Sequence, residues 1–403
     1  MPVIRPFVRN LIAVAGILSC ASIGRGADLP RFDAKEIDSR VGEVCYAVTL
    51  ADVDGDKKPD IVAVTENRVL WYHNPDWKQR VIIADATERD NVCIAPYDID
   101  GDGQIDFALG AGWLNKNLGT IHWLSRGKSL DEPWHVHAIG RESWTHRMRW
   151  GDLSGSGRPQ LVVSPLNKTV GEGVRVLAYE IPKSPKTDPW RLAVVDETLN
   201  AMHNHWMGDL DSDGKVDLIT SSMEGVFLFQ RNSEGALHKI RIGEGAPEPK
   251  GPQKSGAGEI KVGRFKGGRP YLATVEPMHG NQIVIYTSPA GALNAGLWNR
   301  QVLDDTLRRG HALGTADVDH DGTDELVVGH SDAGTGTPGG PGVFVYDPAD
   351  ESGTKWTKHV VDNGGIATED LVVDDLDGDG WPDIVAGGRA THNLKVYFNQ
   401  GGK

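Results

Sequence analysis

The sequence predicts an all-β fold, a seven-bladed β-propeller whose last blade is closed by the N-terminal strand. An acidic loop recurs seven times, and its first positions lie about 46 to 58 residues apart, which is the period of a repeat architecture. Each repeat holds four short strand-like runs separated by turn residues, and no stretch has the period of a long helix. Seven units of four strands are typical of a propeller.

The four runs of each repeat follow in a constant order. The first precedes the acidic loop, as in 46–50 and 311–316, and the second is a β-branched run directly after it, as in 61–64 and 325–328. A third run follows at 69–72, 121–124, 174–179, 226–229, 283–286, 343–346 and 394–398. The fourth opens with a tryptophan in five repeats: Trp77, Trp134, Trp190, Trp298 and Trp356.

The last repeat ends after its third run and lacks a fourth. Residues 32–38, near the start of the chain, have the pattern of the missing strand. We therefore expect this segment to complete the last blade and to remove an open sheet edge. Residues 28–403 would then form one closed propeller domain.

Five of the acidic loops carry carboxylates at positions 1, 3, 5 and 9, a spacing that can surround a hard cation with oxygen ligands. The predicted ligands are Asp52, Asp54, Asp56 and Asp60; Asp98, Asp100, Asp102 and Asp106; Asp209, Asp211, Asp213 and Asp217; Asp317, Asp319, Asp321 and Glu325; and Asp375, Asp377, Asp379 and Asp383. We expect about five structural calcium sites. The loops at 152–156 and 264–268 have lost ligands and are expected to bind weakly or not at all.

Charge and composition restrict which partners the protein can bind and where it is expected to be located. The 403-residue chain has a net charge of -14, which argues against nucleic acid because phosphate binding needs basic patches. Residues 1–27 resemble a secretory signal peptide with an apolar run too short to span a bilayer, so we expect a secreted or periplasmic protein and no integral membrane segment. Cys20 leaves lipoprotein anchoring as an alternative. Cys45 and Cys93 are expected to be buried thiols, and a disulfide between them, which an exported protein permits, is the alternative.

The five loops, with the Leu/Ile-Val-Val/Ala runs after them, resemble the FG-GAP or VCBS family of calcium-loop propellers, as in the head of integrin α chains. The resemblance covers residues 30–400. The resemblance implies a propeller fold and bound calcium. It does not indicate the function, because one propeller fold hosts many functions.

Histidines gather at the predicted opposite face from the acidic loops. His146, His203 and His311 each stand six residues before the first position of their loop, so they occupy equivalent places in three repeats. Four more lie in neighbouring crossings and loops: His205, His279, His330 and His392. Glu259 and Glu369 occupy nearby points in other crossings. Together with a carboxylate such as Glu369, these imidazoles could bind zinc or another transition metal, or act as acid and base. The alternative is that each is an ordinary hydrogen-bonded histidine.

The segments 146–150, 311–313 and 392–395 resemble the propeller portion of aldos-2-ulose dehydratases, which eliminate water from oxidised sugars. The resemblance implies a metal-assisted carbon–oxygen lyase acting on a sugar or keto-sugar. The candidate catalytic residues are His146, Arg147, His203, His205, His279, His311, His392 and Lys395.

Two other functions remain open from the sequence. The protein could be a non-catalytic extracellular module that binds glycan or a protein partner, in which Trp113, Trp144 and Trp206 stack on sugar rings. It could also be a purely structural envelope protein, although that function leaves the histidines without a role. For the lyase and for the binding module, the expected ligand is a carbohydrate or a small sugar.

Overall fold

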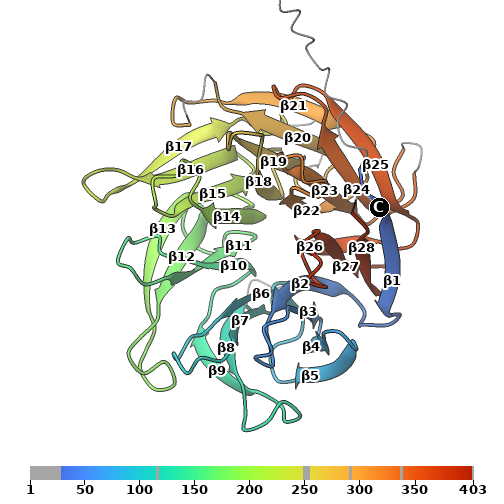
Figure 1. Cartoon of the computed structure of the whole chain (residues 1–403). Coiled ribbons are helices and arrows are strands. Elements are labelled where there is room, and N and C mark those ends of the chain that lie inside the picture. The colour runs from blue at the N-terminus through green and yellow to red at the C-terminus, as the bar shows by residue number, and fades with distance from the viewer. Residues whose placement is uncertain (1–28, 115–117, 248–254, 290–292, 336–338, 402–403) are drawn as a thin grey trace, which may run out of the picture.

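The computed structural model describes residues 29–114, 118–247, 255–289, 293–335 and 339–401. Its 28 strands form seven four-stranded antiparallel sheets arranged around a central axis (Figure 1). The predicted seven-bladed propeller is therefore confirmed. The proposed signal peptide, including Cys20, lies outside the described residues.

We number the blades along the chain, and the first strand of each blade lies next to the axis (Figure 1). Blade 1 comprises β2 (Cys45–Ala51), β3 (Asp60–Thr65), β4 (Arg68–His73) and β5 (Lys78–Ala84). Blade 2 comprises β6 (Asn91–Tyr97), β7 (Asp106–Ala111), β8 (Thr120–Ser125) and β9 (His135–Gly140). Blade 3 comprises β10 (Thr145–Gly151), β11 (Gln160–Pro165), β12 (Val174–Glu180) and β13 (Arg191–Leu199).

The remaining blades follow the same order. Blade 4 comprises β14 (Asn204–Gly208), β15 (Asp217–Ser222), β16 (Gly225–Arg231) and β17 (Leu237–Gly243). Blade 5 comprises β18 (Ile260–Arg264), β19 (Pro270–Glu276), β20 (Gln282–Thr287) and β21 (Asn299–Asp304). Blade 6 comprises β22 (Gly310–Ala316), β23 (Glu325–His330), β24 (Gly342–Pro348) and β25 (Trp356–Asn363). Blade 7 comprises β26 (Thr368–Asp374), β27 (Asp383–Gly388), β28 (Leu394–Asn399) and the N-terminal β1 (Phe32–Asp38).

The ring closes between the two ends of the chain, as the sequence predicts. Strand β1 pairs antiparallel with β28, and Phe32 lies opposite Asn399 while Glu36 lies opposite Lys395. Without β1, the backbone groups of β28 on that side would form an open edge.

The core lies between the blades. The second strand of every blade is buried along its whole length, because a neighbouring blade covers each of its faces. Trp71 and Trp123 are among the largest side chains that are fully buried in this core. Cys45 and Cys93 are buried free thiols, as expected. Among the described residues, no helix is long and apolar enough to cross a membrane.

Candidate functional site

Seven residues, one from each blade, occupy comparable places near the start of the innermost strands, at one end of the central channel. In five blades the innermost strand carries a register shift near its start, and the residue skipped by the pairing is Tyr46, Val92, His146, His311 or Glu369. In blades 4 and 5, His203 and Glu259 directly precede the first paired residues of β14 and β18. Bulges turn a side chain out of the regular alternation of a strand. The bulges thus take His146, His311 and Glu369 out of the regular alternation of their strands.

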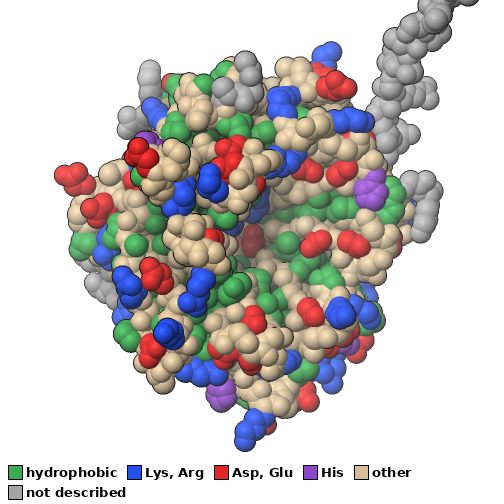
Figure 2. Space-filling model, turned by 60° about the vertical axis from the view of Figure 1, so that its left-hand side comes forward, with side chains coloured by type: hydrophobic (Ala, Val, Ile, Leu, Met, Phe, Trp, Pro, Cys, Tyr) green, Lys and Arg blue, Asp and Glu red, His purple; other side chains and the backbone are tan. Residues whose placement is uncertain are grey.

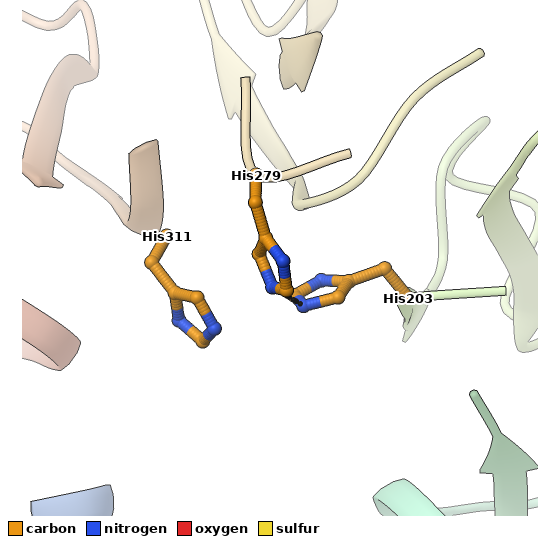
Figure 3. Close-up of side chains that lie close together, drawn as sticks. All are labelled: His203, His279 and His311. Carbon is orange, nitrogen blue, oxygen red and sulfur yellow. Dashed lines mark hydrogen bonds between the residues drawn. The ribbon is translucent and has the colours of Figure 1, made fainter. Parts of the chain in front are cut away.

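Three histidines from three blades meet at this mouth (Figure 3). One nitrogen from each of His203, His279 and His311 lies within 4.8 Å of the others. The Nε2 atoms of His203 and His279 are 2.7 Å apart, and the rings of His279 and His311 are stacked with centroids 4.8 Å apart. We call these three residues the histidine cluster. His146 lies beside it, with its ring centroid 4.7 Å from that of His203.

Two buried carboxylates flank the histidine cluster. Oε1 of Glu259 lies 2.9 Å from Nδ1 of His203 and 3.3 Å from Nη2 of Arg147. Glu369 accepts a hydrogen bond from Arg389, and its Oε1 lies 3.6 Å from Nε2 of His311. The Oε2 atom of Glu369 is buried and has no hydrogen-bond partner within the described part of the chain.

The second nitrogens of two histidines are held by the backbone of the next blade. Nδ1 of His146 lies 3.0 Å from the carbonyl oxygen of His203, and Nδ1 of His311 lies 2.5 Å from that of Glu369. An N–H at Nδ1 would donate to the carbonyl and leave Nε2 as the acceptor or metal-binding atom. These bonds orient the rings as the backbone partners of metal-binding histidines do.

Burial controls the protonation of this site. It holds the pKa of His146 and His279 well below the usual range, and burial together with the charge of Arg147 lowers the pKa of His311 to about 3. These rings are therefore neutral, which is the form that binds metals. Burial raises the pKa of Glu369 against the opposing charges of Arg389, Arg309 and Arg147.

The carboxylate of Glu259 responds differently to its surroundings. Burial acts to raise its pKa, but the charges of Arg147 and Lys261 and the hydrogen bond from Asn204 outweigh that effect and lower it. The two glutamates at the channel mouth thus have opposite tendencies: Glu259 stays ionised, and Glu369 has an increased affinity for a proton.

Three predicted site residues lie away from the histidine cluster. Nδ1 of His205 is 2.8 Å from Oγ of Ser164, between blades 3 and 4. Nδ1 of the exposed His392 is 2.7 Å from the carbonyl oxygen of Glu43. Lys395, on β28, donates to Oδ2 of Asp362 over 2.9 Å. The cluster thus gathers His203, His279 and His311 with His146 and Arg147 beside it, whereas these three side chains have other partners.

Two cavities adjoin the site. One of about 500 Å³ is lined by His279, Arg308 and Arg309 among others, and lies on the blade 5 to blade 6 side. The second, of about 350 Å³, lies in the central channel between the innermost strands and is lined by Arg147, Arg149, Lys261, Asn204 and Asp370 with apolar residues of β2, β6 and β26. Figure 2 shows the molecule hollowed near its centre, with acidic and hydrophobic side chains in the hollow.

The acidic loops lie at the other end of the innermost strands. In all five complete loops, the position-9 carboxylate accepts the backbone N–H of position 2, over distances from 2.7 to 3.1 Å. The position-1 carboxylate accepts the N–H of position 6 at 2.9 to 3.0 Å. These hydrogen bonds turn the loop carboxylates toward a common centre.

Several of these loops can hold a metal ion. Ligand oxygens converge in the groups Asp98, Asp100 and Asp106; Asp209, Asp211 and Asp213; and Asp317, Asp319 and Glu325. Burial raises the pKa of Asp106 and Asp383 to about 7 and that of Glu325 to about 9, with further contributions from neighbouring loop carboxylates. A bound dication would offset this repulsion.

The structure adds one candidate ligand that the sequence spacing does not reveal. His73, at the end of β4, places its Nε2 3.2 Å from Oδ2 of Asp54 and joins Asp54 and Asp56 in a group able to bind metal. It lies outside the loop, so only the hairpin brings it there.

The two eroded loops are held together without such a centre. In the third, Gln160 replaces the position-9 acid and accepts the N–H of Ser154 over 2.9 Å. In the fifth, Arg264 donates to the carbonyl oxygen of Asp209 and Lys266 donates to that of Asp321, over 2.8 and 3.0 Å. The basic side chains thus reach the loops of both neighbouring blades.

Comparison with known proteins supports both resemblances seen in the sequence. Residues 118–289 match the aldos-2-ulose dehydratase β-propeller domain, and residues 52–109 match an FG-GAP-like repeat. Aldos-2-ulose dehydratase of Phanerodontia chrysosporium is 28% identical over 276 residues, which are 62% of this chain and 30% of that enzyme. The chain therefore spans about 30% of the length of this curated relative.

Solved structures share the fold at low sequence identity. A lectin of Agrocybe aegerita that recognises non-reducing terminal N-acetylglucosamine aligns with a TM-score of 0.52 and 15% identity, over 88% of this chain and 94% of the lectin. BBS1N in complex with ARL6DN aligns with a TM-score of 0.53 and 12% identity, over 93% of this chain and 98% of that one. These likenesses concern the propeller architecture.

Proposed function

We propose that this protein is a metal-assisted carbon–oxygen lyase that removes water from an oxidised sugar at the histidine cluster. The observation that carries the proposal is the meeting of His203, His279 and His311, from three separate blades, in a propeller similar to that of aldos-2-ulose dehydratase. Three imidazoles that leave a coordination position open are typical of a catalytic metal site. Zinc or another transition metal fits this donor set.

A metal ion held there would polarise a substrate carbonyl and so acidify the adjacent C–H bond. The chain supplies the proton transfer. Glu369 is suited to this task because Arg389 holds its Oε1, whereas its Oε2 has no hydrogen-bond partner among the described residues. Oε2 would take the proton from the carbon next to the carbonyl and return it to the hydroxyl that leaves from the next carbon. The electron pair of the C–H bond becomes the new C=C bond, and water departs.

The other charged groups orient the histidines and could bind the substrate. Glu259 orients His203 through Nδ1 and keeps Arg147 at the channel mouth. Arg147 donates to the carbonyl oxygen of His146 over 3.0 Å, which fixes the guanidinium next to the cluster. A guanidinium in this place can bind a sugar oxygen on which negative charge develops.

We further propose that the five complete acidic loops bind calcium with a structural role. Their support is the repeated inward hydrogen bonding and the crowding of buried carboxylates. Calcium accepts six to eight oxygen ligands in flexible geometry, which suits such loops.

Sugar binding without turnover is the second candidate function. It is favoured by the aromatic wall at the channel mouth, where Trp113 packs edge-on against Tyr46 and His146 with ring centroids 5.9 and 5.4 Å apart. Aromatic rings of this kind stack on sugars.

Metal analysis and turnover together test the proposal. Purified protein, loaded with zinc and then gently dialysed, is expected to retain one transition metal ion per chain, and His203→Ala is expected to lose it. The loaded protein should convert an aldos-2-ulose to a product with the absorbance of a conjugated enone, and Glu369→Gln should abolish conversion while retaining the metal. Calcium as the sole bound metal, unchanged in His203→Ala, contradicts the lyase; sugar binding without product would favour the binding module.

A further inference from the structure

Below the histidine cluster, the channel holds a second group of charges that the proposed chemistry does not use. Side chains two residues apart on a strand face the same side, so Arg149 follows Arg147 down the channel on β10. Lys261 is the second residue of β18 and stands two residues after Glu259, which directly precedes that strand. Each step of two residues descends about 7 Å. Arg149 and Lys261 therefore form a layer of two cations beneath the cluster, and both line the 350 Å³ cavity.

Neither cation in this layer forms an ion pair with a carboxylate of the described residues. Arg149 donates to the amide oxygen of Asn204 over 2.9 Å, and within the described residues neither it nor Lys261 lies within 4.0 Å of a carboxylate oxygen. Burial and the nearby charge of Arg149 lower the pKa of Lys261 to about 8. Two enclosed like charges repel each other, and burying them without partners is costly.

The acidic groups in the channel do not balance this charge. Arg147 is paired with Glu259. Asp370 also lines the cavity, where its Oδ2 accepts the backbone N–H of Val48 over 3.0 Å. Three cations, Arg147, Arg149 and Lys261, thus face two carboxylates, which leaves one positive charge over. This excess stands out in a chain whose net charge is -14.

We propose that Arg149 and Lys261 form a binding site for the carboxylate of a small ligand inside the channel. The cavity is large enough for a monosaccharide-sized molecule, and Asn204 adds a polar side chain beside both the arginine and Glu259. A planar guanidinium suits the two oxygens of a carboxylate. One negative charge on the ligand matches the one positive charge that is left over.

A sugar acid fits this site best. Its carboxylate would lie between Arg149 and Lys261, and its other end would extend up the channel toward Arg147 and the histidine cluster. This part of the inference rests on the proposed function, because it makes the acidic sugar the substrate of the same site. A free inorganic oxyanion such as phosphate would satisfy the same two cations without reaching the histidines.

The test uses the full chain with its metals and measures binding by calorimetry and melting temperature. Gluconate is expected to bind and to raise the melting temperature, whereas glucose at the same concentration should do neither. Lys261→Met is expected to weaken gluconate binding at least tenfold, and Lys261→Arg should retain it. The outer-strand variant Lys78→Met, which removes an exposed charge, serves as the control. Phosphate binding without gluconate binding would support an anion site at Arg149 and Lys261 but would overturn the inference that its ligand is a sugar acid.

The melting temperature of the ligand-free variants separates this role from a structural one. Removal of Lys261 relieves its repulsion with Arg149, so Lys261→Met without ligand should melt at or above the temperature of the unaltered protein. A lower melting temperature, with no response of the unaltered protein to gluconate or phosphate, overturns the proposal. If Lys261→Met fails to fold, Arg149→Gln and Lys261→Arg give the same comparison.

The two proposals fail in different ways. Zinc content measured on Lys261→Met reports on the histidine cluster alone. Loss of gluconate binding in that variant supports the channel site even where His203→Ala leaves the metal content unchanged, whereas gluconate binding that survives in Lys261→Met overturns the channel site whatever the metal content.

Discussion

The Nδ1 atom of His203 lies 2.9 Å from Oε1 of Glu259, although the two residues belong to neighbouring blades. The Nε2 atom of the same ring lies 2.7 Å from Nε2 of His279. His203 is thus oriented by a carboxylate on one side and faces the other histidines on the opposite side. This is the arrangement in which a carboxylate fixes the ring of a metal-binding histidine and increases its basicity.

The first prediction concerns this carboxylate. Glu259→Gln keeps the size of the side chain but removes its charge, so Nδ1 of His203 no longer faces a carboxylate. We expect zinc affinity to fall by roughly 10- to 100-fold. Competition with a chromogenic chelator measures the affinity. The exposed Glu234→Gln serves as the control for loss of a negative charge, and equal zinc affinity in all three proteins would refute the orienting role of Glu259.

The second prediction concerns calcium. A ligand that binds only the folded form stabilises it by mass action, by about 2.7 kcal/mol at a free concentration one hundred times Kd. Excess chelator selective for calcium should therefore lower the melting temperature sharply. Asp375→Asn, in a complete loop, should remove one calcium ion per chain in elemental analysis, and Asp152→Asn, in the eroded third loop, should remove none. An unchanged melting temperature in chelator would argue against structural calcium.

The third prediction concerns ring closure. Deletion of residues 1–38 removes β1 and exposes the backbone of β28, with the loss of several hydrogen bonds at roughly 1 kcal/mol each. We expect a lower melting temperature and association at the open edge, seen by light scattering. The comparison protein begins at residue 29 and retains β1. Identical melting of the two proteins would show that β1 does not stabilise blade 7.

The fourth prediction concerns acid stability. His122 on β8 has a buried Nε2 without a hydrogen-bond partner in the described ranges, and burial lowers its pKa from 6.5 to about 4. The folded protein therefore binds a proton here less readily than the unfolded chain. The stability from this residue is present above pH 6.5 and is lost as the pH falls toward 4.

At pH 5 this loss amounts to roughly 2 kcal/mol relative to pH 7. His122→Leu should remove it, so urea denaturation of the variant at pH 7 and pH 5 should show a smaller decrease in stability than that of the unaltered protein. The exposed His135→Leu controls for the change of side chain. A decrease of the same size in His122→Leu would disprove the assignment.

Much of the fold follows from local sequence signals. The spacing of the acidic loops sets the number of blades, because each loop joins the first two strands of one blade. The end of the last repeat at its third strand, and the matching pattern at 32–38, are enough to predict the closure seen between β1 and β28. Such signals depend on a residue and its near neighbours in the chain, so they can be read without coordinates.

Part of the candidate site can also be predicted from the sequence, and part of it depends on the tertiary structure. The equivalence of His146, His203 and His311 is visible as a constant distance from the acidic loop. His205 and Lys395 have similar local signals, yet one bonds Ser164 between blades and the other pairs with Asp362. The direction of each side chain depends on strand register and on bulges, which arise from pairing across the sheet.

The order of residues along this chain was sufficient for the number of blades, the strand that closes the ring and the positions of the acidic loops. Only the folded ring decided which histidines meet, that Glu259 orients His203, and that Arg149 and Lys261 share one channel without a carboxylate partner among the described residues. The physical reason is that repeat signals are local, whereas contacts across the channel join blades that lie more than 50 residues apart and form only when all seven sheets surround one axis.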